Sequence, residues 1–302
     1  MATTVARLDV EPKKKYEGRS LTQLAVSRLS RDTLTLIALG MIVLLLLLAF
    51  VGAPVISSVL DVSPTRTNAN QTFLPVGSYP HILGTDDLGR DVLSRLLYAG
   101  QVSLSVGVIA AGLAVSIGVT LGIITGYFGG IVDDLINWVI ATLNSIPSLF
   151  LLLIVAAVLR PSPTTLIIIL GFLGWTGITR LVRGETLSLR EREYVISARA
   201  VGASSWRIMF VHILPNLVSV IIIALALDIG GIILTEAALS FLGLGILPPT
   251  PSWGNMLSNA QGFFTKGVHL VIIPGLMIFV TVLCLYVLGD GLRDAFDPTA
   301  KD

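Results

Sequence analysis

The sequence predicts an all-α integral membrane protein with six membrane-spanning helices. Hydrophobic residues make up 54% of the 302 residues and charged residues only 13%, whereas about 25% of the residues in soluble domains are charged. Six apolar runs have roughly the 20 residues that a helix needs to cross a bilayer. The runs cover residues 33–56, 102–127, 135–159, 165–182, 213–245 and 270–289.

The first run, residues 33–56, follows a polar N-terminal arm, residues 1–32. No cleavage signal of small residues follows it, so we expect a permanent anchor rather than a removable signal peptide. A long polar segment, residues 57–101, then forms the predicted outer loop ahead of a core of five spans, residues 102–290. A short tail, residues 291–302, ends the chain.

The second run carries two rows of small residues at helical spacing. Small side chains let helix backbones approach closely in lipid. The rows therefore predict close helix packing, either within this chain or against a partner subunit. The first row is Ala114, Gly118, Gly122 and Gly126, and the second is Ser103, Gly107 and Ala111.

The third run contains Pro147 three residues after Asn144. Proline removes a backbone hydrogen-bond donor and bends helices. The bend could be a static packing feature or a hinge that opens and closes a pathway. If the pathway passes here, Asn144 is a candidate lining residue.

The fifth run is longer than one span requires, so we expect it to be tilted or broken near Gly230 and Gly231. It contains Asp228 and Glu236, which fall about 80° apart on a helix, broadly on one face. A carboxylate that faces lipid is costly, so both side chains should face the protein interior or a watery path. They are either structural, hydrogen-bonded groups or lining residues of a translocation pathway.

Two segments have the composition of structured loops, residues 57–100 and 247–268. The second segment holds Trp253 after three prolines. Such a tryptophan could anchor the chain at the membrane interface, or it could lie on an outer surface that receives a partner.

The distribution of Lys and Arg predicts the orientation of the chain. The N-terminal arm holds seven of these residues, the region of residues 180–207 holds six and the tail holds two. Only five lie on the opposite side of the predicted topology. We therefore expect both termini and residues 190–216 in the cytoplasm, although the link at residues 129–134 carries no positive charge.

Residues 190–216 form a charged island between two apolar runs. A short helix is predicted over residues 193–200, because Gly202 can adopt the left-handed backbone that ends a helix. Ser204 or Ser205 can cap a following helical turn, and Pro215 suits the start of the next helix. This compact unit is either an amphipathic loop on the membrane surface or a docking element for another protein.

Several site types are missing from the sequence. The single cysteine, Cys284, allows no disulfide within the chain and no cysteine metal cluster. The three histidines are scattered, and no Gly-Lys pair exists to form a phosphate-binding loop. A net charge of +1 gives no reason to expect nucleic acid as a partner. If transport here uses ATP, another chain must bind it.

Four segments resemble the second permease of dipeptide, oligopeptide and nickel importers, a family of binding-protein-dependent ABC importers. They are LGTDDLGRDVLSRLLYAG at 83–100, REREYVISARAVGASSWRIMFVHILPN at 190–216, EAALSFLGLGILPPTPSWGNML at 236–257 and GDGLRDAFDP at 289–298. In this family the loop at 183–212 would be the EAA loop. Ile196 and Ser197 replace the leading Glu-Ala of its motif, whereas Ala198, Gly202, Leu214 and Pro215 match.

The resemblance implies the type I ABC importer fold, with a coupling helix that docks into an ATPase subunit. It implies three groups of functional residues. The coupling residues are Glu193, Tyr194, Ser197, Ala198, Arg199, Ala200, Gly202, Ala203 and Pro215. Candidates for the translocation path are Asp228, Glu236 and Asn144. Candidates for docking of the binding protein are Asp86, Asp87, Arg90, Asp91 and Trp253.

The same resemblance implies a second, homologous permease that forms a heterodimer with this chain, two ATP-binding subunits and an extracytoplasmic substrate-binding protein. ATP and Mg would bind to the partner subunits, and this chain would bind no cofactor or metal. It would reside in the inner or plasma membrane of a bacterium or archaeon. Peptides are the expected substrates, with glutathione or nickel complexes as alternatives.

Two other classes of membrane protein are alternatives. An ion-coupled secondary transporter would explain Asp228 and Glu236 but not the charged island at 190–216. A membrane-embedded hydrolase has no support, because the sequence shows no His, Cys or Ser–Lys arrangement that suits catalysis.

Overall fold

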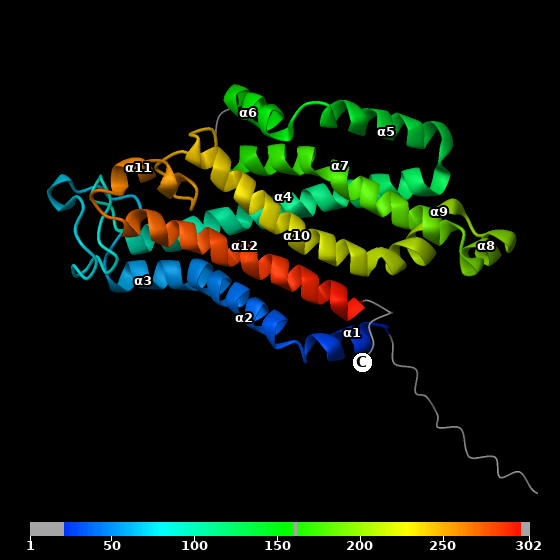
Figure 1. Ribbon diagram of the computed structural model, residues 1–302, viewed down its shortest axis with the longest axis horizontal. Helices are drawn as coiled ribbons and strands as arrows, with labels where there is room; N and C mark the ends of the chain where they lie inside the picture. Colours follow the sequence, from blue (N-terminus) through cyan, green and yellow to red (C-terminus); the bar gives the residue numbers. More distant parts are fainter. Residues whose placement is uncertain (1–20, 160–161, 297–302) are drawn as a thin grey trace, which may run out of the picture.

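The computed structural model describes residues 21–159 and 162–296, and within these ranges helices are the only extended regular elements (Figure 1). They lie side by side along the length of the molecule. The predicted arm up to residue 20 and the tail from residue 297 lie outside the described residues.

Five helices are long and apolar enough to cross a membrane, and a bent helix pair adds a sixth if it is counted as one span. The first span, Thr33–Val59, combines α2 (Thr33–Leu47), a π-helical turn (Leu48–Gly52) and α3 (Ala53–Val59). The others are α4 (Val92–Phe128), α7 (Pro163–Arg190), α10 (Leu214–Phe241) with the turns before it, and α12 (His269–Phe296). The prediction of an all-helical membrane protein is confirmed.

The third predicted span is divided into two helices. They are α5 (Gly130–Asn144) and α6 (Ser148–Val158), and they meet at an angle of 80°. Pro147 precedes α6 in an extended conformation, with φ −54° and ψ 126°. Proline has no backbone N–H, so it cannot donate the hydrogen bond that a continuous helix would need at this point. The sequence therefore located the interruption correctly but underestimated its size.

Of the two alternatives for the fifth span, a tilt or a break, the break near Gly230 and Gly231 is wrong, because α10 runs through both residues without interruption. Gly230 faces Leu285 and Val282 of α12, where a Cβ atom would lie 3.7 Å from each side chain, an ordinary contact distance. The irregular part lies earlier, in a π-helical segment at Ile208–Ile213 that joins α9 (Ser205–Arg207) to α10.

Two helices extend beyond their predicted apolar runs. Helix α4 begins at Val92, ten residues before the predicted start, because Asp91 caps it by accepting a 2.6 Å hydrogen bond from Ser94 N. Helix α7 continues to Arg190, so the first part of the predicted loop at 183–212 is helical. Hydropathy marks the apolar stretch alone and misses polar helix ends.

The first small-residue row of α4 packs against α7. A Cβ atom at Gly118 would lie 2.7 Å from Ile178 Cβ, and one at Gly122 would lie 2.7 Å from Val182 Cβ. One at Gly126 would similarly meet Thr186 Cβ at 2.6 Å. The prediction of packing within the chain is confirmed for this row, and the alternative of packing on a partner is wrong for it.

The second small-residue row of α4 faces α10. A Cβ atom at Gly107 would lie 2.6 Å from Ile233 Cγ1, and Ser103 donates a hydrogen bond to Glu236. The two rows therefore place α4 between α7 and α10, and they position the elements of the candidate site described below.

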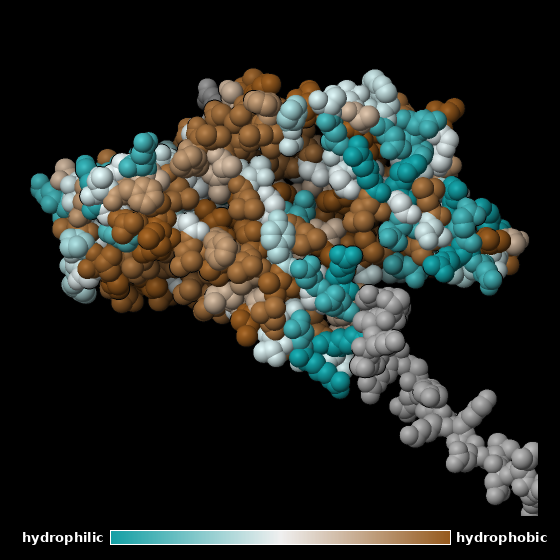
Figure 2. Space-filling model, in the orientation of Figure 1, coloured by the Kyte–Doolittle hydropathy of each residue, from teal (hydrophilic) through white to brown (hydrophobic). Residues whose placement is uncertain are grey.

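The two ends of the molecule differ (Figure 1). One end, called the loop end, holds the segments at 60–91 and 242–268, which include α11 (Ala260–Phe263). The opposite end holds α8 (Glu193–Ala200) and α9 and is called the knob end; α1 (Leu21–Leu29) and the last turn of α12 lie toward it. Figure 2 shows apolar surface across the middle of the molecule and polar surface gathered at the knob end.

Candidate functional site

The first part of the candidate site is a helical knob, residues 193–207, made of α8, α9 and the turn between them. Helix α8 spans Glu193–Ala200, the range that the sequence predicts. Gly202 follows it with φ +88°, a left-handed conformation that residues with a Cβ atom rarely adopt. Its N–H bonds the carbonyl of Arg199 at 3.0 Å, which ends the helix. The predicted glycine stop is confirmed.

The second half of the knob turns the chain back toward the membrane. Ser204 caps α9, and its Oγ accepts a 3.3 Å hydrogen bond from Arg207 N. The π-helical segment follows, and Pro215 lies in the first turn of α10, as predicted for a helix start. Knob and α10 are therefore one nearly continuous helical path.

Buried side chains fasten the knob to the spanning helices. Val195 of α8 is fully buried in a cluster with Ile208 and Met209 behind it and with Ile178 and Val182 of α7. Burial of one such side chain contributes about 1.5–3 kcal/mol. The knob is therefore packed on the helices beneath it.

Polar contacts add to this connection. The Nη1 atom of Arg190, at the end of α7, donates to the carbonyls of Gly126 and Tyr127 at 3.3 and 3.2 Å. These carbonyls end α4, where cationic groups are favourable. The guanidinium of Arg199 lies 5.7 Å from the centre of the Tyr127 ring, which links α8 to the same helix end.

The outward face of the knob presents apolar and charged side chains together. Val201 is 89% exposed and Trp206 is 61% exposed, and the Trp206 ring stacks on Phe210 at 5.8 Å. Most of the predicted coupling residues also reach solvent. Exposed members of that set are Glu193, Tyr194, Ser197, Arg199, Ala200, Gly202 and Pro215, and partly exposed members are Ala198 and Ala203. Exposed apolar side chains on a rigid, polar-rimmed element are typical of a protein interface.

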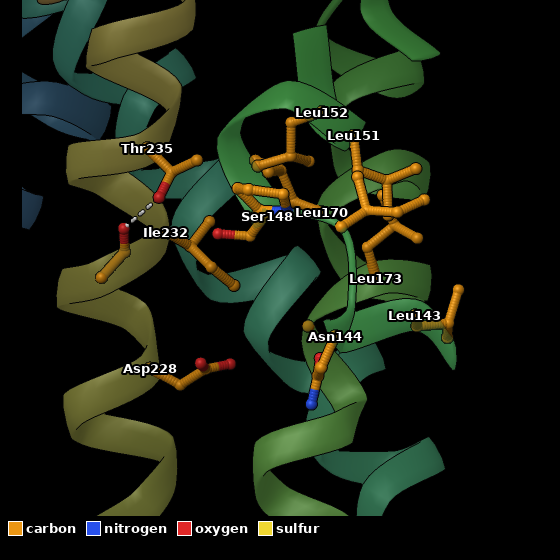
Figure 3. A pocket seen from close by; sticks show the side chains of 14 residues that line it. Leu143, Asn144, Ser148, Leu151, Leu152, Leu170, Leu173, Asp228, Ile232 and Thr235 are labelled. Carbon is orange, nitrogen blue, oxygen red and sulfur yellow. Dashed lines mark hydrogen bonds between the residues drawn. The ribbon is translucent and has the colours of Figure 1, made fainter. Parts of the chain in front are cut away.

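The second part of the candidate site is a cavity of about 460 Å³ between α10, α7 and the break between α5 and α6. Figure 3 shows Asp228 reaching from α10 toward Asn144 at the end of α5. Half of the fourteen lining residues are leucine or isoleucine, and Ser148 and Thr235 add hydroxyl groups. A mainly apolar wall with a few polar groups is typical of small-ligand sites.

Asp228 is the only charged residue among the described residues that line this cavity. Its Oδ2 atom is buried and has no hydrogen-bond partner in the described part of the chain. Asn144 is held at the rim, where its Oδ1 accepts a 3.4 Å hydrogen bond from Thr176. The structure thus brings together two of the three predicted pathway residues.

Glu236, the third predicted pathway residue, lies apart from the cavity. Its side chain is fully buried, and its two carboxylate oxygens accept hydrogen bonds from Ser103 Oγ at 2.9 Å and Ser240 Oγ at 2.7 Å. Ser103 Oγ accepts from Trp253 N at 3.2 Å, and Ser240 Oγ accepts from Ile246 N at 2.9 Å. Glu236 therefore holds the 242–259 segment on α4 and α10, in agreement with the structural alternative.

The structure corrects the docking role expected for Trp253. Its side chain is only 1% exposed, its indole N–H donates to the Leu96 carbonyl at 3.0 Å, and its ring covers Gly100. A side chain so enclosed can neither anchor in the membrane interface nor contact a docked protein. Trp253 instead joins the segment after α10 to the first turns of α4.

Three of the four charged residues expected at the docking surface are also buried. Asp86 bonds Arg90 at 2.7 Å and Arg95 at 3.3 Å, and Asp91 caps α4 while it contacts His81 at 2.9 Å. Asp86, Arg90 and Asp91 are at most 9% exposed, so they hold the loop end together rather than face a partner. Asp87, with 31% of its side chain exposed, is the member of the set that reaches solvent.

An ion pair between α5 and α7 was not predicted from the sequence. Arg183 Nε and Nη2 each lie 2.5 Å from one carboxylate oxygen of Asp133. The available signal was a pair of opposite charges at the edges of the third and fourth apolar runs, but nothing in the sequence pairs residues 50 positions apart.

The described residues contain no group of three or more His, Cys, Asp and Glu side chains that could hold a metal ion. The candidate site consists of two features, the exposed knob and the cavity around Asp228.

Two family models match the chain. A family model described as binding-protein-dependent transport system inner membrane component matches residues 118–302, which include the knob and α10. A second model, described as the N-terminal TM domain of oligopeptide transport permease C, matches residues 20–75.

Curated relatives cover most of the chain. The dipeptide transport system permease protein DppC of Alkalihalophilus pseudofirmus is 38% identical over 96% of this chain and 94% of its own length. The protein of the same name from Haemophilus influenzae is 39% identical, with 79% and 82% covered. The glutathione transport system permease protein GsiD of Pectobacterium atrosepticum is 42% identical over 74% of each chain.

Proposed function

Because the chain belongs to the family of binding-protein-dependent transport system inner membrane components, we propose that it forms half of the pathway of an ATP-driven importer of short peptides. It is a non-catalytic permease subunit of an ABC importer of the dipeptide and glutathione type. Membership of this family implies a substrate-binding protein and ATPase subunits as partners.

The attachment of the knob to the spanning helices supports a role in coupling them to an ATPase. Val195 is fully buried in one cluster with side chains of α7 and of the π-helical segment, and Arg190 bonds the carbonyls that end α4. An ATPase that moved the exposed face of α8 would therefore move α4, α7 and α10 as well. We propose that residues 193–203 dock into an ATPase subunit and that this linkage switches the cavity between the two sides of the membrane.

The orientation follows from charge. Arg183, Arg190, Arg192, Arg199 and Arg207 all lie at or near the knob end, and positive residues favour the cytoplasmic side of membranes. We propose that the knob and both termini lie in the cytoplasm of a bacterial or archaeal cell. The loop end would then face the binding protein, with Asp87 at its surface.

Short peptides are the proposed substrates, and we propose dipeptides in preference to glutathione. Relatives named for dipeptide transport include one that aligns with 96% of this chain, whereas the glutathione permease aligns with 74%. A cavity of about 460 Å³ lies within the 300–1,000 Å³ common for small-ligand sites. A second permease and two ATPase subunits would complete the transporter, with ATP and Mg on the ATPases.

Reconstitution of this chain with its second permease and ATPases in proteoliposomes tests the proposal. Uptake of a labelled dipeptide should require both ATP inside and the binding protein outside, and unlabelled dipeptide should compete better than glutathione. Better competition by glutathione would reassign the substrate. Uptake that follows a proton gradient in the absence of ATP would contradict the importer class and support an ion-coupled transporter.

A further inference from the structure

We propose that Asp228 is the counter-charge for the ammonium group of the peptide during its passage through the membrane. The inference rests on the proposed import of peptides and names the chemical group that the cavity recognises. It starts from one observation: the cavity presents a single carboxylate whose Oδ2 is buried without a hydrogen-bond partner in the described residues.

An unpaired carboxylate in this position is costly. Asp228 lies near the middle of α10 (Leu214–Phe241), about 20 Å from either end at 1.5 Å per residue. At that depth a charged group needs a partner or a water-filled cavity. Among the described residues that line the cavity, no side chain is cationic. A transported ligand can supply the matching charge that these described lining residues do not.

The ammonium group of a peptide also loses hydration when it enters the membrane. Its transfer from water into an apolar passage is unfavourable unless an opposite charge receives it. The leucine-rich wall around Asp228 lowers the local dielectric constant and so strengthens a direct ion pair. An ion pair between the carboxylate and the ammonium would offset the free-energy cost of burying each charge while the peptide crosses the membrane.

The remaining polar groups fit a small polar ligand better than a single inserted side chain. Asn144, Ser148 and Thr235 line the same cavity as Asp228 (Figure 3). They lie at the end of α5, at the start of α6 and in α10, respectively. The cavity volume of about 460 Å³ exceeds the volume of one lysine side chain. A peptide could place its ammonium at Asp228 and its amide groups near these three residues.

Two substitutions of Asp228 test the role of its charge in the complete transporter. Asp228→Asn removes the charge with little change of shape, and we expect it to lower the maximal rate of peptide uptake about tenfold or more. Asp228→Glu keeps the charge and should retain most of the uptake. The matched control is Asp290→Asn, an equal change at an exposed position on α12, which should leave uptake unchanged. Assembly with the partners is measured for each variant.

A direct measurement of occupancy completes the test. A carbodiimide that modifies carboxyl groups is reacted with the purified four-subunit complex, and the modification of Asp228 is quantified by mass spectrometry. Trialanine should protect Asp228, and N-acetyl-trialanine, which lacks the ammonium, should protect it several-fold less. Equal protection by both peptides, or no protection by trialanine, overturns the inference.

The outcomes separate this inference from the proposed function. If the wild-type complex shows no ATP-dependent peptide uptake, the proposed function fails. If wild-type uptake is normal and Asp228→Asn matches it, only the inference fails. If Asp228→Asn instead prevents association with the second permease, Asp228 pairs with a cation of that subunit, and the inference is also overturned.

Discussion

The side chains of Ser103 and Glu236 meet at 2.9 Å between α4 and α10, although 133 positions separate them in the sequence. Ser103 Oγ already accepts a hydrogen bond from Trp253 N, and Ser240 Oγ accepts one from Ile246 N. Each hydroxyl therefore directs its own proton to Glu236. The carboxylate is the common acceptor that holds the segment after α10 in place.

This directionality predicts the effect of Glu236→Gln. The amide NH₂ of glutamine would point a donor at a hydroxyl that already accepts one, so one hydrogen bond is lost and a buried donor is left unsatisfied. We expect a loss of about 1–3 kcal/mol of stability, measured as a lower thermal unfolding midpoint of the purified protein. Glu185→Gln, at an exposed position on α7, is the matched control. A variant at 236 as stable as this control would show that the donor directions are different.

The packing of α4 on α7 predicts that Gly122 tolerates no added side chain. A Cβ atom there would lie 2.7 Å from Val182 Cβ and 2.9 Å from the Thr179 carbonyl, so Gly122→Ala should force the helices apart. Overpacking of this kind costs about 1–3 kcal/mol. We expect less folded protein in detergent extracts of membranes, measured by size-exclusion chromatography.

Gly112→Ala is the matched control for this prediction. Gly112 lies on the same helix, but a Cβ atom there would have no neighbour within 4 Å. Alanine also favours helix formation relative to glycine. Equal yields of folded protein from the two variants would contradict the close contact between α4 and α7.

The left-handed backbone at Gly202 predicts a graded series of effects on coupling. Space is open around its Cα, so only the φ of +88° opposes a side chain. Asparagine tolerates this conformation better than β-branched residues do. Gly202→Val should therefore reduce ATP-dependent uptake strongly and Gly202→Asn only mildly, with normal amounts of both proteins in the membrane. Gly184→Val, at an open helical position of α7, serves as the control. Equal uptake by the valine and asparagine variants would argue against a role for backbone conformation.

The knob was predictable from the sequence because its determinants are local. Gly202, Ser204 and Pro215 each act on the backbone within a few residues, through a helix stop, a cap and a helix start. The apolar runs likewise located the spanning helices. Their polar ends were missed, because capping by Asp91 extends α4 where hydropathy has already fallen.

Contacts between distant segments could not be predicted in the same way. The carboxylates of Asp228 and Glu236 lie on one helix, yet one lines a cavity and the other is enclosed by two serines. The residues next to Trp253 in the sequence do not show whether it is enclosed or lies at the membrane interface. Only the packing of α4, α7 and α10 distinguishes these cases, and a single sequence does not give that packing.

The ion pair between Asp133 and Arg183 leads to the last prediction. Both guanidinium contacts measure 2.5 Å, and Asn137 Nδ2 also donates to Asp133 Oδ1 at 2.7 Å. The two side chains are 14% and 31% exposed, so water screens the pair only in part. Because the pair joins α5 to α7 on the side of the cavity nearest the knob, its loss should loosen the bent helix pair of α5 and α6.

A double-mutant cycle measures this interaction. Asp133→Asn, Arg183→Gln and the double variant are compared by thermal unfolding, and we expect a coupling energy of about 1 kcal/mol or more, because two-point guanidinium–carboxylate pairs are stronger than single contacts. Asp134→Asn, at the exposed neighbouring position, should show a smaller coupling with Arg183→Gln, because Asp134 acts on Arg183 through its charge without a direct ion pair. A coupling energy near zero for the Asp133 cycle would mean that the pair does not hold the two helices together. A coupling energy as large as expected would identify it as the polar connection between the broken span and the helix that ends at the knob.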